Sequence, residues 1–182
     1  PDRKSGRGKK IKFSEVKEVA LREGIEVLQP ESLKTDEFAN TLRELSPDLL
    51  LVVAYGIIVP QQILEIPKYG CINIHASLLP RWRGASPMEH AILSGDKKSG
   101  ITFMKMTKGL DEGPIFETHE CSLDADDQLT DLENKLFNLS KKNLIPFLKT
   151  VGEKNKLILQ KDRDATFAPK ISKEFLQIRW NQ

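Results

Sequence analysis

The stretch that decides the fold is Cys71-Ile-Asn-Ile-His-Ala-Ser-Leu-Leu-Pro-Arg-Trp-Arg-Gly-Ala-Ser-Pro87. It begins as an apolar run typical of a buried strand and ends in a helix start, with serine suited to the cap and proline to the first helical position. Residues two apart on a strand point to the same side, so Asn73 and His75 place an amide and an imidazole on one face. A lone histidine near a strand end is more often a structural residue than a catalyst, so further residues must decide its role.

Strand-like and helical segments alternate along the chain. Asp48–Ala54 is a nearly continuous Leu/Val run, typical of a parallel strand buried on both faces. The alternation predicts an α/β domain with a mainly parallel sheet and flanking helices. Further strands are predicted at Ile25–Leu28, Cys71–His75, Gly100–Met106 and Ile115–Cys121, and helices at 14–23, Thr35–Leu45, Pro60–Glu65, Ser86–Ser94 and from the capping box Thr130-x-x-Glu133 to a kink or restart at Pro146.

A carboxylate follows the predicted strand that ends at Met106. Gly109-Leu-Asp-Glu-Gly-Pro114 holds Asp111 in a turn bracketed by glycines, which lets the acid approach another backbone closely. Amide, imidazole and carboxylate suit acyl transfer to an amine. Asn73 and a protonated His75 would donate to the oxyanion, while Asp111 would hold the imidazolium and take a proton from the amine, directly or through one water.

Two motifs together resemble the folate-dependent formyltransferase family: Asn73-x-His-x-Ser-Leu-Leu-Pro80 and, about thirty residues on, Leu110-Asp-x-Gly113. The segments Val52–Pro60, Arg81–Pro87 and Ile171–Glu174 also fit. The resemblance implies a Rossmann-like sheet, with Asn73, His75 and Asp111 as the catalytic residues. Because the basic segment 1–10 resembles that of the members that act on tRNA, the implied reaction moves a formyl group from 10-formyltetrahydrofolate to the α-amine of methionine on initiator tRNA.

The resemblance also implies two binding regions. Folate contacts are expected at Ser77, Leu78, Leu79 and Pro80. The segment Gly56, Ile57 and Ile58 follows a buried strand at the carboxyl edge of the sheet, where its exposed backbone would pair with the pteridine. Contacts to tRNA are expected at Arg7, Lys9 and Lys10, and no metal is expected.

The N-terminal segment has a second interpretation. Residues 1–12 hold six basic residues and one acid, and their two glycines and lack of apolar periodicity predict a mobile loop. By charge alone this loop is either a solvated terminus or a contact for RNA phosphates. Trp82 likewise has two interpretations: a platform for a base, or a hydrophobic plug whose flanking arginines cap carbonyl groups.

The resemblance implies an incomplete domain. Because the family fold opens with a strand–helix–strand unit, we expect residues 13–170 to form a catalytic domain that lacks this unit and 171–182 to begin a linker to a C-terminal domain. Two residues depart from the family pattern: Ala76 replaces a usual glycine, and Glu112 replaces a small residue. Glu112 adds a negative charge beside Asp111.

Composition limits the classes of protein. Hydrophobic residues make up 39% of the 182 residues and charged residues 30%, as in one soluble cytosolic domain, and the net charge is only +2. The two cysteines, Cys71 and Cys121, lack metal-ligand spacing and are interpreted as reduced thiols. No apolar run is long enough to span a membrane. We expect a cytoplasmic monomer without a membrane partner, and the start at Pro1 leaves an organelle matrix open.

Three rival functions remain open at this point. A sister formyltransferase would act on a sugar or purine-pathway amine, and a formyl-folate hydrolase would use the same three residues with water. The basic segment argues against both, because a small acceptor needs no such arm. The third rival is a non-catalytic RNA-binding fragment, which should not bind folate.

Overall fold

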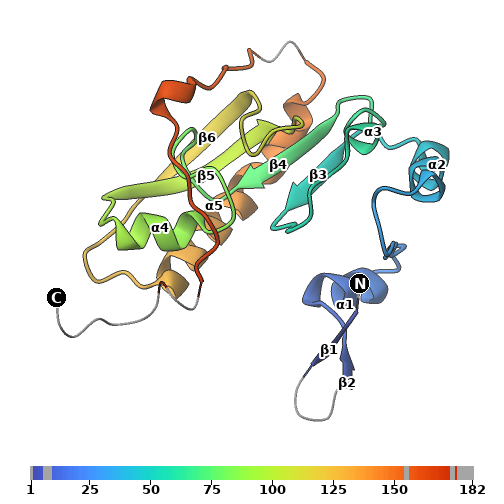
Figure 1. Ribbon diagram of the computed structural model, residues 1–182, viewed down its shortest axis with the longest axis horizontal. Coiled ribbons are helices and arrows are strands. Elements are labelled where there is room, and N and C mark those ends of the chain that lie inside the picture. The colour runs from blue at the N-terminus through green and yellow to red at the C-terminus, as the bar shows by residue number, and fades with distance from the viewer. Residues whose placement is uncertain (1, 6–9, 154–155, 173–174, 176–182) are drawn as a thin grey trace.

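The computed structural model describes residues 2–5, 10–153, 156–172 and 175 (Figure 1). Strands and helices alternate along most of this length, which confirms the predicted α/β class. In chain order the elements are β1 (Arg3–Ser5), β2 (Lys10–Lys12), α1 (Glu15–Arg22), α2 (Asp36–Leu45), β3 (Leu50–Val53), α3 (Gln61–Leu64), β4 (Cys71–His75), α4 (Pro87–Leu93), β5 (Lys98–Lys105), β6 (Ile115–Ser122), α5 (Leu129–Thr150) and the 3₁₀ helix η1 (Asp162–Asp164).

The main sheet has the strand order β3-β4-β5-β6. The predicted parallel pairing is confirmed for β3 with β4, which are joined through α3. The other two pairs, β4 with β5 and β5 with β6, are antiparallel. The sheet is therefore mixed, and the turn that carries Asp111 closes the β5–β6 hairpin.

The two faces of β4 have different partners. Ile72 and Ile74 enter the larger core, where α4 and α5 cover the sheet. Cys71 enters a second core with residues of α2 and α3. Because side chains alternate along a strand, Asn73 and His75 share the side of Cys71 and face away from α4 and α5.

Helix α5 anchors the larger core. Phe147 stacks on Phe103 of β5 with ring centroids 4.3 Å apart. The predicted capping box at Thr130 is wrong, because the helix begins two residues earlier with a reciprocal cap between Gln128 and Asp131. Pro146 does not restart the helix, which continues to Thr150, and burial of its apolar face outweighs the one hydrogen bond that proline removes. The alternative, a kink at Pro146, stays a prediction.

The strand predicted at residues 25–28 and the burial predicted for β3 both fail for one physical reason. Residues 25–28 form no strand, and no neighbouring strand is present beside them among the described residues. Within the part of the chain that the structure describes, β3 pairs with β4 alone and is an edge strand (Figure 1). Its Leu51 and Val53 are 36% and 56% exposed, in contrast to the predicted burial on both faces.

The N-terminal segment differs from the predicted loop. β1 and β2 form an antiparallel pair with Ser5 opposite Lys10, so residues 3–5 and 10–12 are regular structure. The glycines that suggested a loop, Gly6 and Gly8, fall between the two strands. Arg7 and Lys9 lie outside the described residues. Among those described, no helix combines the length and hydropathy needed to cross a membrane.

Candidate active site

The structure brings His75 and Asp111 together. His75 ends β4, and its Nδ1 lies 3.6 Å from Oδ2 of Asp111, with only 6% and 16% of the two side chains exposed. The other ring nitrogen, Nε2, lies 2.8 Å from the carbonyl oxygen of Trp82. Since a carbonyl can only accept, Nε2 carries a proton and donates it. The remaining ring nitrogen, Nδ1, faces the carboxylate of Asp111.

The Asp111 turn is held by close backbone contacts. Asp111 adopts the left-handed conformation with φ of 48°, and its Oδ2 accepts a hydrogen bond of 2.9 Å from the backbone N–H of Gly84. A Cβ at Gly113 would lie 1.8 Å from the carbonyl oxygen of Lys105, so only glycine fits there. The glycine bracket noted in the sequence thus has a steric cause. The added carboxylate of Glu112 lies against Gly109.

Asn73 stands two residues before His75 on the same side of β4. It is half-buried, and its side-chain amide makes no hydrogen bond to any residue that the structure describes. The amide is therefore free to donate to a ligand on that face. The geometry offers one uncommitted donor, one imidazole and one carboxylate. Both ring nitrogens of His75 already face partners, Trp82 and Asp111, so the structure shows no free ring N–H for the predicted donation from His75 to the oxyanion.

Trp82 belongs to a hydrogen-bonded group with Arg81 and Asp96. Its indole N–H donates to Asp96 over 2.8 Å, and Arg81 makes two hydrogen bonds to the same carboxylate while lying over the indole ring. The hydrogen bond from Arg81, aided by that from Trp82, holds the pKa of Asp96 below its usual range although burial opposes it. This arrangement favours the plug over the base platform. The flanking arginines, however, bind side chains and not carbonyl groups.

The predicted folate contacts in 77–80 are largely used by the protein itself. Ser77 is buried, and its hydroxyl donates to the carbonyl of Arg81 over 2.6 Å. Thr102 donates to the carbonyl of Ser77 and accepts from the N–H of Leu79, whose side chain is buried. Only Leu78 and Pro80 remain half-exposed. Ser77 and Leu79 therefore shape the turn, and Leu78 and Pro80 are the members with accessible surface.

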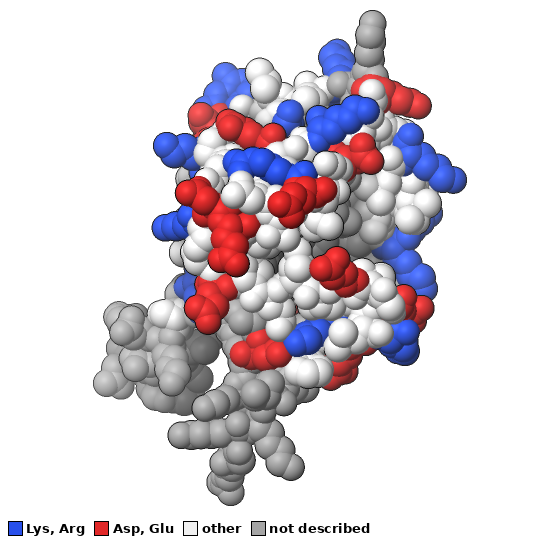
Figure 2. Space-filling model, turned by 90° about the vertical axis from the view of Figure 1, so that its right-hand side faces the viewer, with Lys and Arg blue, Asp and Glu red and all other residues white. Residues whose placement is uncertain are grey.

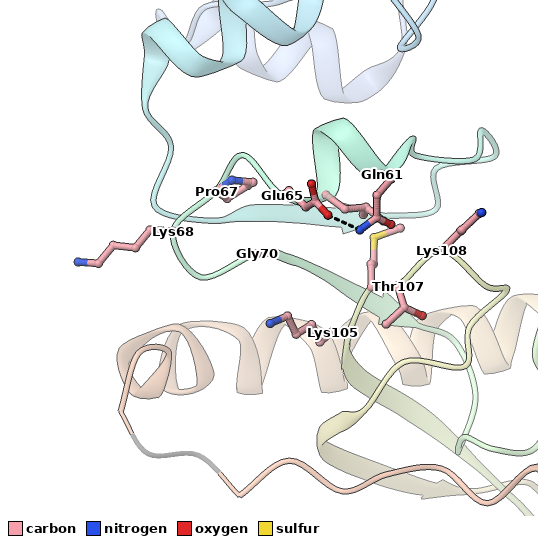
Figure 3. A pocket seen from close by; sticks show the side chains of 10 residues that line it. Gln61, Glu65, Pro67, Lys68, Gly70, Lys105, Thr107 and Lys108 are labelled. Carbon is pink, nitrogen blue, oxygen red and sulfur yellow. Dashed lines mark hydrogen bonds between the residues drawn. The ribbon is translucent and has the colours of Figure 1, made fainter.

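The second predicted folate segment is open to solvent. Ile57 and Ile58 are 49% and 81% exposed, and Gly56 beside them is also exposed. A pocket of about 410 Å³ lies next along the chain, between α3, the turn at 67–70 and the segment 105–108 that leads to Asp111 (Figure 3). Within it Gln61 donates to Glu65 over 2.6 Å. Asn73, His75 and Asp111 do not line this pocket.

The sequence did not reveal the residues that follow α5. Gln160 donates to the carbonyls of Asp111 and Gly113, and Arg83 donates to Gln160 and Asp162. No motif or spacing marks Gln160 or Asp162, because both come from an irregular segment that lies far along the chain from the Asp111 turn. Of the predicted tRNA contacts, Arg7 and Lys9 are outside the described residues, and only the backbone of Lys10 is described.

A model of the formyl transferase family matches residues 1–148. The chain belongs to the formyl transferase family. A methionyl-tRNA formyltransferase of Caldanaerobacter subterraneus subsp. tengcongensis is 50% identical over 183 residues, which cover 99% of this chain and 59% of that protein. The chain thus spans less than two thirds of the length of this family member.

Solved structures of other proteins share the fold. Phosphoribosylglycinamide formyltransferase from Streptococcus pneumoniae TIGR4 superposes with a TM-score of 0.68 at 24% identity, over 74% of this chain and 79% of that one. HypX from Aquifex aeolicus in complex with tetrahydrofolic acid superposes with a TM-score of 0.67 at 19% identity, over 79% of this chain and 24% of that one. These two likenesses concern the fold alone.

Proposed function

We propose that the chain is the catalytic part of an enzyme that transfers a formyl group from 10-formyltetrahydrofolate to the α-amine of methionine on initiator tRNA. The observation that carries the proposal is the 3.6 Å approach of Asp111 to His75, beside an uncommitted amide. Identity of 50% to a methionyl-tRNA formyltransferase, over 99% of this chain, supports the choice of acceptor. The rival acceptors, a sugar or a purine-pathway amine, belong to relatives that are more distant.

The proposed reaction joins a nitrogen to the formyl carbon. The neutral α-amine attacks that carbon, and the resulting oxyanion receives a hydrogen bond from Asn73 and the positive field of His75. Asp111 takes one proton from the attacking nitrogen, directly or through one water, and returns it to N10 of the folate as the carbon–N10 bond breaks. The products are N-formylmethionyl-tRNA and tetrahydrofolate.

The formyl donor would bind on the side of Asn73 and His75. Exposed Ile57 and Ile58 supply apolar surface at the end of β3. The 410 Å³ pocket adjoins both the helix that follows them and the segment that leads to Asp111. We place the folate along this surface, with its formyl group directed toward His75.

The tRNA contact would come from the N-terminal segment. On the side of the molecule that carries α2, basic and acidic side chains are interspersed and form no field of one sign (Figure 2). The proposed contact therefore rests on Arg7, Lys9 and Lys10. Neutralising both lysines should weaken tRNA binding and flatten its salt dependence by a log–log slope of up to about 2. An unchanged slope would leave the segment as a solvated terminus.

An acceptor panel tests the proposal. The complete protein encoded by the gene is mixed with 10-formyltetrahydrofolate and, separately, methionyl initiator tRNA, glycinamide ribonucleotide, a nucleotide-linked amino sugar, or no acceptor. We expect kcat/KM for the tRNA to exceed that for either small amine by at least about 10³. Preference for a small amine would identify a sister formyltransferase, and equal turnover without an acceptor would identify a hydrolase. RNA binding without folate binding would identify a non-catalytic fragment.

A further inference from the structure

The segment that follows α5 crosses the candidate active site. Ile158 and Ile115 exchange two backbone hydrogen bonds of 2.8 and 2.9 Å at the start of β6. Farther on, Phe167 forms a β-bridge with Arg83, in the loop before α4. Figure 1 shows this segment in orange to red, running past the sheet toward α4. It therefore ties the β5–β6 hairpin to the loop after β4.

Gln160 lies in this segment, and both the nitrogen and the oxygen of its side-chain amide are hydrogen-bonded. Its Nε2 donates to the carbonyl oxygens of Asp111 and Gly113 over 2.8 and 2.7 Å. Its Oε1 accepts from Nε of Arg83 over 3.0 Å. The reversed amide would set its oxygen against two carbonyl oxygens, so the contacts determine the orientation. One side chain thus links the Asp111 turn to the Arg83 loop.

The Asp111 turn and the Arg83 loop are also hydrogen-bonded to each other directly. Gly84 follows Arg83 in the chain, and its N–H donates to the carboxylate of Asp111 over 2.9 Å. On its outer side Arg83 is fixed by Asp162, over 3.0 Å, and by the backbone of Thr166, over 2.9 Å. Gln160 therefore joins the same two segments, the Arg83–Gly84 loop and the Asp111 turn, as the hydrogen bond that orients the carboxylate of Asp111.

The Asp111 turn needs such support. Asp111 has a φ of 48°, a left-handed conformation that residues with a Cβ adopt uncommonly, although aspartate adopts it more readily than most. A residue persists in that conformation when surrounding contacts fix it. Gln160 supplies two of these contacts, to the carbonyls on either side of Glu112.

We propose that Gln160 is a positioning residue: its amide holds the Asp111 turn so that the carboxylate faces His75. The kinetic consequence rests on the formyl transfer proposed above, whereas the geometric consequence does not. The contacts of Gln160 are to Asp111, Gly113 and Arg83, so the proposed role is exerted through Asp111.

Two substitutions in the complete protein separate the contacts of Gln160. Gln160→Glu keeps the length and the acceptor for Arg83 but removes both donors to the turn, whereas Gln160→Met keeps the length and removes all three contacts. We expect each to lower kcat by about 10², as a displaced catalytic group does, with KM for 10-formyltetrahydrofolate within about threefold. Normal kcat in Gln160→Glu would overturn the proposal, because the donors to the turn would then be dispensable.

A matched control separates positioning from general stability. Gln128 caps α5 and is also hydrogen-bonded, but it lies outside the candidate site. Gln128→Met removes a similar amide and should leave kcat within about twofold. A loss as large as that of Gln160→Met would mean that destabilisation alone explains the effect.

The Asp111→Asn background tests whether Gln160 acts through the carboxylate. If it does, Gln160→Glu should lower the residual turnover of Asp111→Asn by less than about threefold, because the group it positions has already lost its function. A further loss of about 10² would show that Gln160 acts elsewhere and would overturn the proposal.

Amide hydrogen exchange gives a readout that does not depend on the reaction. The Gly84 N–H should exchange slowly in the unaltered protein and at least about tenfold faster in both Gln160 variants, but not in Gln128→Met. Faster exchange in a protein that transfers no formyl group would refute the proposed function and keep the positioning role. Unchanged Gly84 exchange would overturn the positioning role, whatever the activity.

Discussion

Asp111→Asn removes the negative charge that lies 3.6 Å from Nδ1 of His75 and keeps the shape of the side chain. The remaining oxygen still accepts the N–H of Gly84, so the turn retains its anchor. Both side chains are largely buried, so solvent screens the interaction between them less than it would at the surface. Proton transfer by a positioned base contributes about 10²–10⁴ to a rate. We therefore expect kcat to fall by at least about 10³, or about 4 kcal/mol of transition-state stabilisation.

Single-turnover formyl transfer to methionyl initiator tRNA measures this loss without interference from product release. Titration of 10-formyltetrahydrofolate should give an affinity within about threefold of the unaltered protein, because the folate surface is intact. A rate within about tenfold would refute the role of Asp111 in proton transfer. A large loss of folate affinity would instead place Asp111 in ground-state binding.

Other predictions concern neighbouring parts of the molecule. Phe147 is buried, and Phe147→Ala should lower the free energy of unfolding by about 3–5 kcal/mol. Phe137 lies in the same helix but is 65% exposed, and Phe137→Ala should lower it by less than about 1 kcal/mol. Urea titration measures both changes. Because the hydrogen bond from Arg81 lowers the folded-state pKa of Asp96, that carboxylate stabilises the fold above its unfolded pKa, and the stabilisation is lost as pH falls through the folded value. The stability advantage over Asp96→Asn should thus be full near neutral pH and shrink below about pH 4; an advantage independent of pH would contradict this. Arg7→Ala should impair kinetics with charged initiator tRNA and leave formyl-folate affinity unchanged, and intact tRNA kinetics would remove Arg7 from the interface.

The sequence predicted most accurately the helices and strands that are determined by nearby residues, such as caps and apolar runs. Cys71–His75 forms β4 with the predicted boundaries, because its apolar run is bounded by turn residues and lies inside the sheet. The α2 helix ends at Leu45 as predicted and begins after Thr35, whose hydroxyl accepts the N–H of Phe38. Residues 25–28 did not form the predicted strand, since a strand also needs a neighbour to pair with, which local sequence does not reveal.

The candidate site divides in the same way. Asp111 could be paired with His75 in advance because both follow predicted strands, and the glycines mark a turn with a special backbone. Gln160 could not be found, because its role depends on a side chain from an irregular segment that reaches a turn 49 residues earlier. The folate contact at Ser77 stays a prediction; the hydrogen bond from its hydroxyl to the carbonyl of Arg81 is a contact that only the folded turn reveals.

The most direct test of the account follows the formyl carbon. The complete protein is given 10-formyltetrahydrofolate labelled at that carbon together with methionyl initiator tRNA, and the products are separated by mass. The account predicts that the label appears on the α-nitrogen of methionine, at a rate that depends on Asp111, with one tetrahydrofolate released per formyl group transferred. Label recovered as free formate, or no transfer by the unaltered protein, would contradict it.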